Sequence, residues 1–229
     1  RARCALGVLI NLRQAILSAA WLDGSVIFSE ELPLEPMCDA EDTVVRLAAR
    51  LAELMKQHRV KKDSVIGLGI AIRGITSPDG RVVRNSFGAL NTKDFPICDR
   101  FEALTGLSCV MSNNVRALFA AQMFKSRDDD LSSQFFLRCE YGIGASLSIN
   151  GRIWRGSSEQ CAEIGHIPVI KRGGKPCSCG KSGCLETIAS PTAILSGALA
   201  LLSPERTPVL WNICKGRSAD EITIEDVFD

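Results

Sequence analysis

One short stretch of this 229-residue chain carries the side chains of a complete metal site. After His166 and ten further residues, the chain reads Cys177-Ser-Cys179-Gly-Lys-Ser-Gly-Cys184-Leu-Glu186. Three thiolates and one imidazole make a tetrahedral set for Zn²⁺ and leave no position for a catalytic water. The spacing therefore predicts a structural zinc ion bound by His166, Cys177, Cys179 and Cys184. The alternative is four buried side chains without a metal, but three cysteines so close together rarely pack as plain core.

Composition limits the classes of protein to which this chain can belong. Apolar residues make up 46% of it, enough for a sizeable core, and it contains no apolar run long enough to span a membrane. The formal net charge is +1 with both signs interspersed, so this segment is not expected to bind nucleic acid by itself. Most of the ten cysteines are scattered, which favours free thiols in a reducing cytoplasm over a secreted disulfide framework.

Apolar periodicity predicts an α/β chain made of two related halves, each a mixed sheet with helices. Predicted strands cover residues 5–10, 15–22, 25–28, 64–72, 81–83, 108–111, 135–139, 145–149 and 152–154. Predicted helices cover residues 42–56, 97–104, 114–124, 191–202 and 209–214. Helix-start patterns at 218–221 and 223–226 lie close to Asp229, so the second half is expected to be incomplete.

The metal motif also carries a family resemblance. The run Ala162-Glu163-Ile-Gly-His166, followed by the pattern CxCGxxGCLE, resembles the signature of the ROK family of repressors, open reading frames and sugar kinases. The resemblance implies an actin-like ATPase fold of the ribonuclease H type, in which two lobes with mixed sheets enclose a sugar. It implies an N-terminal lobe at residues 1–112 and a C-terminal lobe with the zinc loop at residues 113–229, truncated at its end.

Family kinases use phosphate-binding groups that this chain lacks. After the first strand they carry Asp-x-Gly-Gly-Thr, whose glycines let the backbone approach the nucleotide phosphates. Aligned on Gly7, this chain reads Leu9-Ile-Asn11-Leu12-Arg13, so side chains fill the space that a phosphate needs. The second phosphate loop, roughly Gly-Thr-Gly-x-Gly in the family, reads Glu140-Tyr-Gly-Ile-Gly144, and its carboxylate would repel polyphosphate. No ATP is therefore expected to bind.

A second, independent departure removes the catalytic base. Kinases of the family carry Asn-Asp at the start of the interlobe helix, and the Asp accepts the proton of the sugar hydroxyl. Here the pair is Asn113-Asn114, and an amide cannot accept that proton, although Asn114 can still bond to a hydroxyl. The chain is therefore predicted not to be an enzyme.

The resemblance implies sugar-hydroxyl contacts from Glu163, His166, Glu186, Asn113, Asn114 and Gly74. Several alternatives stay open. Glu163 and Glu186 could instead orient the ligating imidazole, and Asn113 could be a helix N-cap. His166 could bind the metal through one ring nitrogen and a hydroxyl through the other. Ala89 stands where a sugar-binding Asn is usual, which indicates an unusual ligand or a decayed pocket.

These features together predict the effector-binding and dimerisation domain of a NagC-like ROK transcriptional regulator. Its effector would be a sugar or sugar phosphate, and a winged helix-turn-helix head expected upstream of Arg1 would bind DNA. The family branch implies a homodimer or homotetramer with no membrane partner. Two alternatives remain: an ATP-dependent hexose kinase with altered loops, and a non-enzymatic sugar-binding protein that has no DNA-binding head.

Overall fold

The computed structural model describes residues 3–126 and 133–228, and it divides into two compact units. The first unit comprises Arg1–Leu131 and Arg152–Cys161, and the second comprises Ser132–Gly151 and Ala162–Asp229. The chain therefore visits the first unit twice. The lobe boundary expected between residues 112 and 113 remains a prediction.

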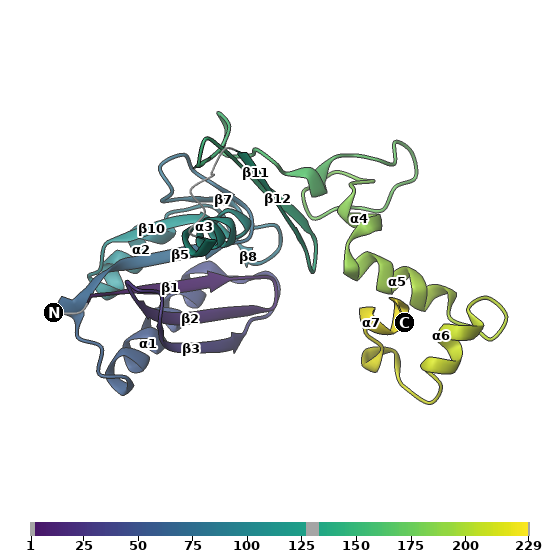
Figure 1. Ribbon diagram of the computed structural model, residues 1–229, viewed down its shortest axis with the longest axis horizontal. Coiled ribbons are helices and arrows are strands. Elements are labelled where there is room, and N and C mark those ends of the chain that lie inside the picture. Colours follow the sequence, from purple (N-terminus) through teal and green to yellow (C-terminus); the bar gives the residue numbers. More distant parts are fainter. Residues whose placement is uncertain (1–2, 127–132, 229) are drawn as a thin grey trace. The chain divides into compact units, whose positions relative to one another are not determined.

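A five-stranded mixed sheet forms the centre of the first unit (Figure 1). Its strands, in spatial order, are β10 (Cys109–Asn113), β5 (Val65–Ile72), β1 (Cys4–Ile10), β2 (Gln14–Trp21) and β3 (Val26–Pro33). β1, β2 and β3 are antiparallel neighbours, whereas β10, β5 and β1 run parallel. The three strands predicted at the start of the chain are thereby confirmed.

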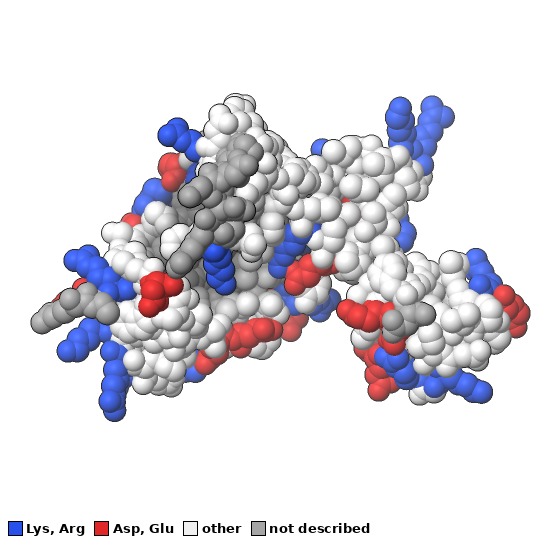
Figure 2. Space-filling model, viewed as in Figure 1, with Lys and Arg blue, Asp and Glu red and all other residues white. Residues whose placement is uncertain are grey.

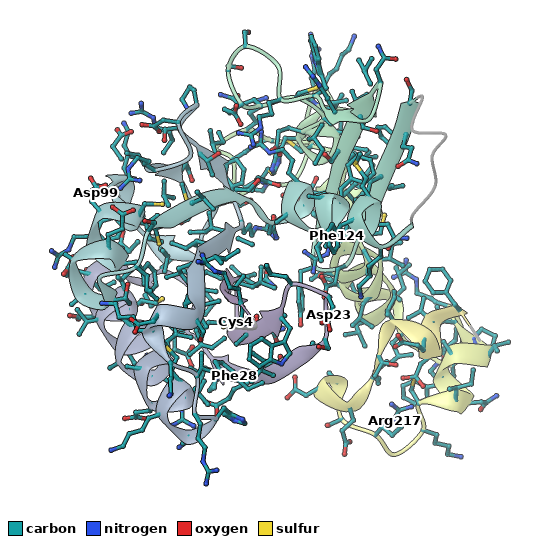
Figure 3. The ribbon with its side chains drawn as sticks, turned by 60° about the vertical axis from the view of Figure 1, so that its left-hand side comes forward. Cys4, Asp23, Phe28, Asp99, Phe124 and Arg217 are labelled. Atoms are coloured by element: carbon teal, nitrogen blue, oxygen red, sulfur yellow. The ribbon has the colours of Figure 1, made fainter. Side chains whose placement is uncertain are left out.

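Helices α1 (Ala40–Gln57) and α2 (Ile97–Thr105) pack against each other in this unit. α1 begins where it does because the Asp39 carboxylate accepts the backbone N–H three residues on, at 2.9 Å. The buried stripe of α1 includes Val44, Leu47 and Leu51, whose spacing places them on one helix face. This stripe, the alternate buried residues of β1 and the ring of Phe28 belong to one hydrophobic core (Figure 3).

The first unit is completed by several short elements, most of which the sequence did not predict, and by the helix predicted at residues 114–124. β4 (Cys38–Asp39) pairs in parallel with β8 (Leu90–Asn91), while β6 (Ile75–Thr76), β7 (Val83–Asn85) and β9 (Lys93–Phe95) form a small antiparallel sheet. The 3-10 turn η1 (Lys62–Ser64) precedes β5, and α3 (Asn114–Ser126) follows β10 directly. The strand predicted at residues 81–83 is wrong in position. The residues before Val83 form a turn in which Val82 donates its N–H to the Ser77 hydroxyl.

The second unit contains a strand pair and several short helices. β11 (Ser133–Cys139) and β12 (Ile143–Ile149) are antiparallel, and β13 (Arg152–Ile153) follows the Asn150-Gly151 turn as the chain returns to the first unit. Helix α5 (Pro191–Leu201) begins because the Ser190 hydroxyl accepts the N–H of Ala193 at 3.1 Å, and Pro191 suits the first turn of a helix. The remaining helices are η2 (Ile164–His166), α4 (Glu186–Ala189), α6 (Pro208–Ile213), η3 (Ala219–Glu221) and α7 (Ile224–Phe228).

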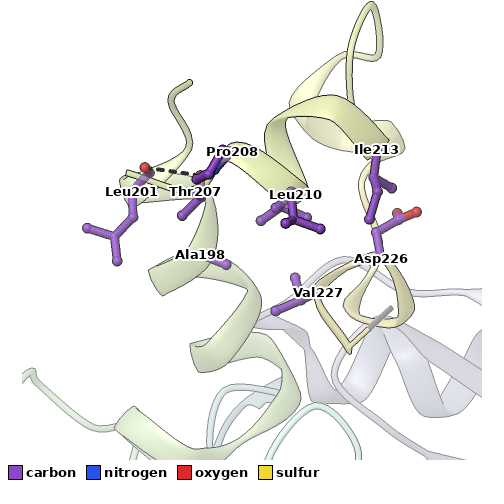
Figure 4. Close-up of a pocket in the computed structure, with 9 residues that line it drawn as sticks. Ala198, Leu201, Thr207, Pro208, Leu210, Ile213, Asp226 and Val227 are labelled. Atoms are coloured by element: carbon purple, nitrogen blue, oxygen red, sulfur yellow. Dashed lines mark hydrogen bonds between the residues drawn. The ribbon is translucent and has the colours of Figure 1, made fainter. Parts of the chain in front are cut away.

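An apolar groove of about 400 Å³ lies among α5, α6 and α7 (Figure 4). Its walls include the side chains of Leu201, Leu210, Ile213 and Val227. At one end the Thr207 hydroxyl donates to the Leu201 carbonyl at 3.4 Å. None of the predicted metal or sugar ligands lines this groove.

The surface and the thiols agree with the composition. Basic and acidic side chains are interspersed over the face shown in Figure 2. Within the residues that the structure describes, no helix combines the length and hydropathy needed to cross a bilayer.

All ten cysteines are free thiols, and Cys4, Cys98, Cys109 and Cys214 are buried, as expected of cysteines that act as small apolar residues.

Candidate functional site

The four predicted metal ligands lie together in the second unit. One ligand atom from each of His166, Cys177, Cys179 and Cys184 lies within 4.8 Å of the others. Cys179 Sγ is 3.7 Å from Cys184 Sγ, and Cys177 Sγ is 3.4 Å from His166 Nδ1. In a tetrahedral zinc site, metal–ligand bonds of about 2.3 Å to sulfur and about 2.0–2.1 Å to nitrogen place such pairs about 3.8 Å and about 3.6 Å apart. The cluster therefore has the donor set and the dimensions to hold a metal ion.

A folded-back loop brings these ligands together. Isolated β-bridges pair Pro168 with Cys184 and Pro176 with Ser182. Gly183 has a φ of 72°, and a Cβ atom at this position would lie 2.1 Å from the carbonyl oxygen of Ile170. Only glycine tolerates both the left-handed backbone and this close approach. The glycines of the CxCGxxGC pattern therefore shape the loop, and the cysteines supply the donors.

Glu186 lies at the edge of the cluster. Its Oε1 atom is 3.5 Å from His166 Nδ1 and accepts a hydrogen bond from Cys177 Sγ at 3.3 Å. Burial raises the pKa of the Cys177 thiol to about 12 and raises the pKa of Cys184. A metal ion has to displace those protons, so metal affinity should increase with pH. Glu186 therefore approaches Nδ1, the ring nitrogen that faces the cysteines, and not the second ring nitrogen through which a carboxylate orients a metal-bound imidazole.

Asn113 and Gly74, both predicted sugar contacts, are joined directly in the first unit. Asn113 Nδ2 donates to the carbonyl oxygen of Gly74 at 2.9 Å. Asn113 Oδ1 accepts the N–H groups of Val115 and Arg116 at 2.9 and 3.3 Å. The side chain therefore acts as a cap at the start of α3, the alternative role foreseen for it. Gly74 has a φ of 129°, and a Cβ atom there would lie 2.0 Å from the Asn85 carbonyl oxygen, so this turn requires glycine.

The two departures from the kinase pattern meet in space. Asn114 Nδ2 donates to Asn11 Oδ1 at 3.2 Å, and both side chains are buried. By the family resemblance, Asn114 is expected at the position of the kinases' catalytic base, and Asn11 at the position of the first glycine of their phosphate loop. The sequence presents these departures as independent because the two residues lie 103 positions apart. Their direct contact shows that they form one local arrangement.

Sequence reasoning missed a buried ion pair near this arrangement. Arg116 Nη1 donates to Glu159 Oε2 at 2.5 Å, and the two side chains are only 6% and 8% exposed. Arg116 follows the Asn-Asn pair by two positions, and Glu159 precedes Glu163 by four, but neither belongs to a recognisable motif. The available sequence signal was a charged residue, Arg116, within an apolar segment, and this signal did not identify Glu159 as its partner.

The structure places the predicted sugar ligands in two groups. Gly74, Asn113 and Asn114 belong to the first unit, whereas Glu163, His166 and Glu186 belong to the second. In the second group, Glu163 precedes η2, and its carbonyl oxygen accepts the N–H of His166 at 3.1 Å. The short helix therefore fixes the spacing between the Glu163 backbone and the ligating histidine.

Comparisons with known proteins connect this geometry to a family. The sequence model of the ROK family matches residues 23–227. A glucokinase of Halalkalibacterium halodurans is 30% identical over 184 residues, covering 80% of this chain and 54% of that protein. The DNA-binding transcriptional dual regulator NagC of Escherichia coli K12 is 26% identical over 232 residues, covering 98% of this chain and 56% of that protein. The chain thus spans about half the length of these curated relatives.

Solved structures share the fold over nearly the whole chain. A ROK family transcriptional regulator described as a homologue of the E. coli MLC protein matches with a TM-score of 0.75 and 24% identity, covering 99% of this chain and 54% of that one. A ROK family glucokinase from Streptomyces griseus, in complex with glucose and AMPPNP, matches with a TM-score of 0.79 and 24% identity, covering 99% and 70%. The actin-like, mixed α/β fold predicted from the sequence is confirmed.

Proposed function

Because the chain belongs to the ROK family, we propose that it is the effector-binding module of a ROK transcriptional regulator, which binds a sugar without phosphorylating it. The match to the regulator NagC supports this branch because it covers 98% of the chain. The family also contains kinases, so the choice between the branches rests on the chemistry of the site.

The contact between Asn114 and Asn11 carries the proposal. Phosphoryl transfer to a sugar needs a base at the hydroxyl, and general-base catalysis contributes about 10²–10⁴-fold in rate. Asn114 offers an amide there, and its Nδ2 is already bonded to Asn11 Oδ1. The Asn11 side chain occupies a position where a phosphate loop needs glycine. The carboxamide of Asn114 would thus replace the base, and the carboxamide of Asn11 would replace a glycine of the phosphate loop.

The metal that best fits the cluster is Zn²⁺. His166, Cys177, Cys179 and Cys184 would hold it, and their separations suit its tetrahedral coordination. With all four positions filled by protein, zinc would supply a cross-link and no catalytic water. The Cys/His loop would then be fixed next to the two acidic residues that flank it, Glu163 and Glu186.

Sugar recognition would use the acidic and amide groups that the family resemblance implies. The carboxylates of Glu163 and Glu186 can each accept more than one hydroxyl proton. His166 presents Nδ1 to the cluster, so Nε2 would be the nitrogen that meets a hydroxyl. Asn114 would bond to a hydroxyl, and Asn113 would act mainly by holding the Gly74 turn in place.

Regulation would proceed by a shift between conformations. A sugar or sugar phosphate that binds one arrangement of the two units more tightly increases the population of that arrangement. In a homodimer or homotetramer, the change would alter the spacing of DNA-reading heads upstream of this module, and so their fit to paired half-sites.

Isothermal titration with glucose and N-acetylglucosamine, with and without ATP, tests the proposal together with a phosphorylation assay. We expect heat with at least one sugar, no heat with ATP alone and no turnover. Glu163→Gln should weaken sugar binding about tenfold or more, because hydrogen bonds to charged groups contribute about 1.5–3 kcal/mol. Glu205→Gln, at an exposed position of the same unit, is the matched control. Turnover at the rate of an ordinary hexose kinase would overturn the proposal.

A second candidate function is an ATP-dependent hexose kinase. It is favoured by the glucokinase relative, whose 30% identity exceeds the 26% of NagC. The variant Asn11→Gly/Asn114→Asp separates the two candidates. A regulator should gain at most slight ATP turnover from these changes, whereas a kinase that works with altered loops should already turn over as the parent protein.

A further inference from the structure

The buried pair of Arg116 and Glu159 joins α3 to the segment Arg152–Cys161, the second visit of the chain to the first unit. Besides the 2.5 Å contact with the carboxylate, Arg116 Nη2 donates to the carbonyl oxygen of Glu159 at 3.3 Å. The guanidinium therefore holds both the side chain and the backbone of this residue. Removing one partner would leave the other charge buried and uncompensated. The pair therefore strongly opposes separation of α3 from the segment Arg152–Cys161.

The backbone of Glu159 is in a conformation that a glutamate adopts at a cost. Its φ is 57°, in the left-handed region that glycine occupies freely and that other residues rarely visit. Strained backbones of this kind persist where the surrounding structure holds them, and they concentrate at functional sites. Here Arg116 bonds to both the carboxylate and the carbonyl oxygen of Glu159, and Arg155 Nη1 lies 4.0 Å from Glu159 Oε1.

The same arginine is tied to residues of the proposed sugar site. Its N–H donates to Asn113 Oδ1 at 3.3 Å, and its Nη2 donates to Thr76 Oγ1 at 3.4 Å. Asn113 in turn bonds to the Gly74 carbonyl oxygen at 2.9 Å. A closed set of hydrogen bonds thus links the Gly74–Thr76 turn, the start of α3 and the loop that contains Glu159.

The ion pair lies just before the point where the chain passes from the first unit to the second. The chain leaves the first unit between Cys161 and Ala162 and reaches Glu163 one residue later. Ala162 also has a left-handed φ, of 65°. The ion pair therefore fixes the last anchored residues before the carboxylate that is proposed to bind the sugar.

We propose that Arg116 and Glu159 are positioning residues of the effector site. They do not touch the ligand. They hold residues 152–161 on the first unit, and so set the point from which Glu163 reaches a sugar hydroxyl. This inference rests on the proposed function, in which Glu163 binds the sugar.

The test uses the double variant Arg116→Met/Glu159→Gly. It removes both buried charges together, and it places glycine where the backbone is left-handed, so the variant should fold with an unfolding midpoint close to that of the parent. Hydrogen exchange should become about tenfold faster in residues 155–161 and stay unchanged in β5. Affinity for the sugar that binds the parent, glucose or N-acetylglucosamine, should fall about tenfold.

Two further variants distinguish positioning from general stability. Arg116→Lys keeps a cation opposite Glu159, so it should retain most of the parent's sugar affinity. Arg50→Met/Glu30→Gln removes a half-exposed pair of the same unit, with contacts of 2.6 and 2.7 Å, and should alter neither the exchange of residues 155–161 nor sugar affinity.

The outcomes separate this inference from the proposed function. A folded double variant that binds the sugar as well as the parent, or that shows unchanged exchange in residues 155–161, overturns the positioning role alone. A parent protein that binds neither sugar overturns the proposed function and the inference together.

Discussion

The two units of this protein are stabilised in different ways. The first contains a continuous hydrophobic core that extends from Leu6 to Met111 and joins the five-stranded sheet to α1 and α2. In the second, α5 and α6 contain no buried residue, and Cys184 at the metal cluster is among the few fully buried side chains. The first unit thus depends on apolar burial, whereas the second contains a Cys/His cluster whose proposed metal ion would supply a cross-link.

The largest expected effect is the loss of the metal. Cys179→Ser, or chelation of the parent protein, should unfold much of the second unit, because structural zinc contributes about 10–16 kcal/mol in small zinc domains. The first unit should keep its sheet. Metal stoichiometry and residue-resolved hydrogen exchange measure both effects. Cys139→Ser, at an exposed cysteine, is the control. Full metal content with unchanged melting in Cys179→Ser would contradict the cross-link.

A core truncation should show the opposite pattern. Phe101→Ala removes a ring that is 0% exposed in the first unit, and such changes cost about 3–5 kcal/mol. The free energy of unfolding of the first unit should fall by this amount while metal binding is preserved. Phe124→Ala, where the ring is 72% exposed, should change it by less than about 0.5 kcal/mol. Equal effects of the two substitutions on the first unit would argue against a single continuous core.

A smaller effect is expected from the glycines of the metal loop. Gly183→Ala combines a left-handed φ of 72° with a Cβ only 2.1 Å from the Ile170 carbonyl oxygen. Gly173→Ala has a φ of 70° but meets nothing within 4 Å, so it isolates the backbone strain of about 1–2 kcal/mol. Competition with a chromophoric chelator should show lower metal affinity for Gly183→Ala than for Gly173→Ala. Identical affinities would mean that the loop relaxes without cost.

The smallest effect concerns pH at the end of the second unit. A hydrogen bond from Arg217 lowers the pKa of Asp226 to about 2, and Asp226 also accepts the Thr223 N–H at the start of α7. Because the folded pKa lies below the ordinary value, this contribution is present above about pH 4 and is lost as pH falls toward 2. NMR of α7 during acid titration measures it. Asp226→Asn should abolish this transition, and its persistence would assign the transition to another group.

Sequence patterns predicted the features that depend on neighbours in the chain. Apolar runs indicated β1 and β2, the apolar stripe indicated α1, and close cysteine spacing indicated the metal cluster. Contacts between distant residues were not predictable in this way. Asn11 meets Asn114 across 103 positions and Arg116 meets Glu159 across 43, so no local pattern reports either pair. The two-residue strands β4, β6 and β8 were missed because they are shorter than any detectable periodicity.

The double visit of the chain to the first unit has a practical consequence for dissection. Residues 132–151 leave that unit, residues 152–161 return to it, and residue 162 leaves it again. Neither unit can be excised as one uninterrupted fragment without severing part of the other. A cut placed after residue 131 would remove the ten-residue segment that supplies Glu159 and leave Arg116 as an orphaned charge. Separate expression of the units therefore calls for a circularly permuted or two-piece design.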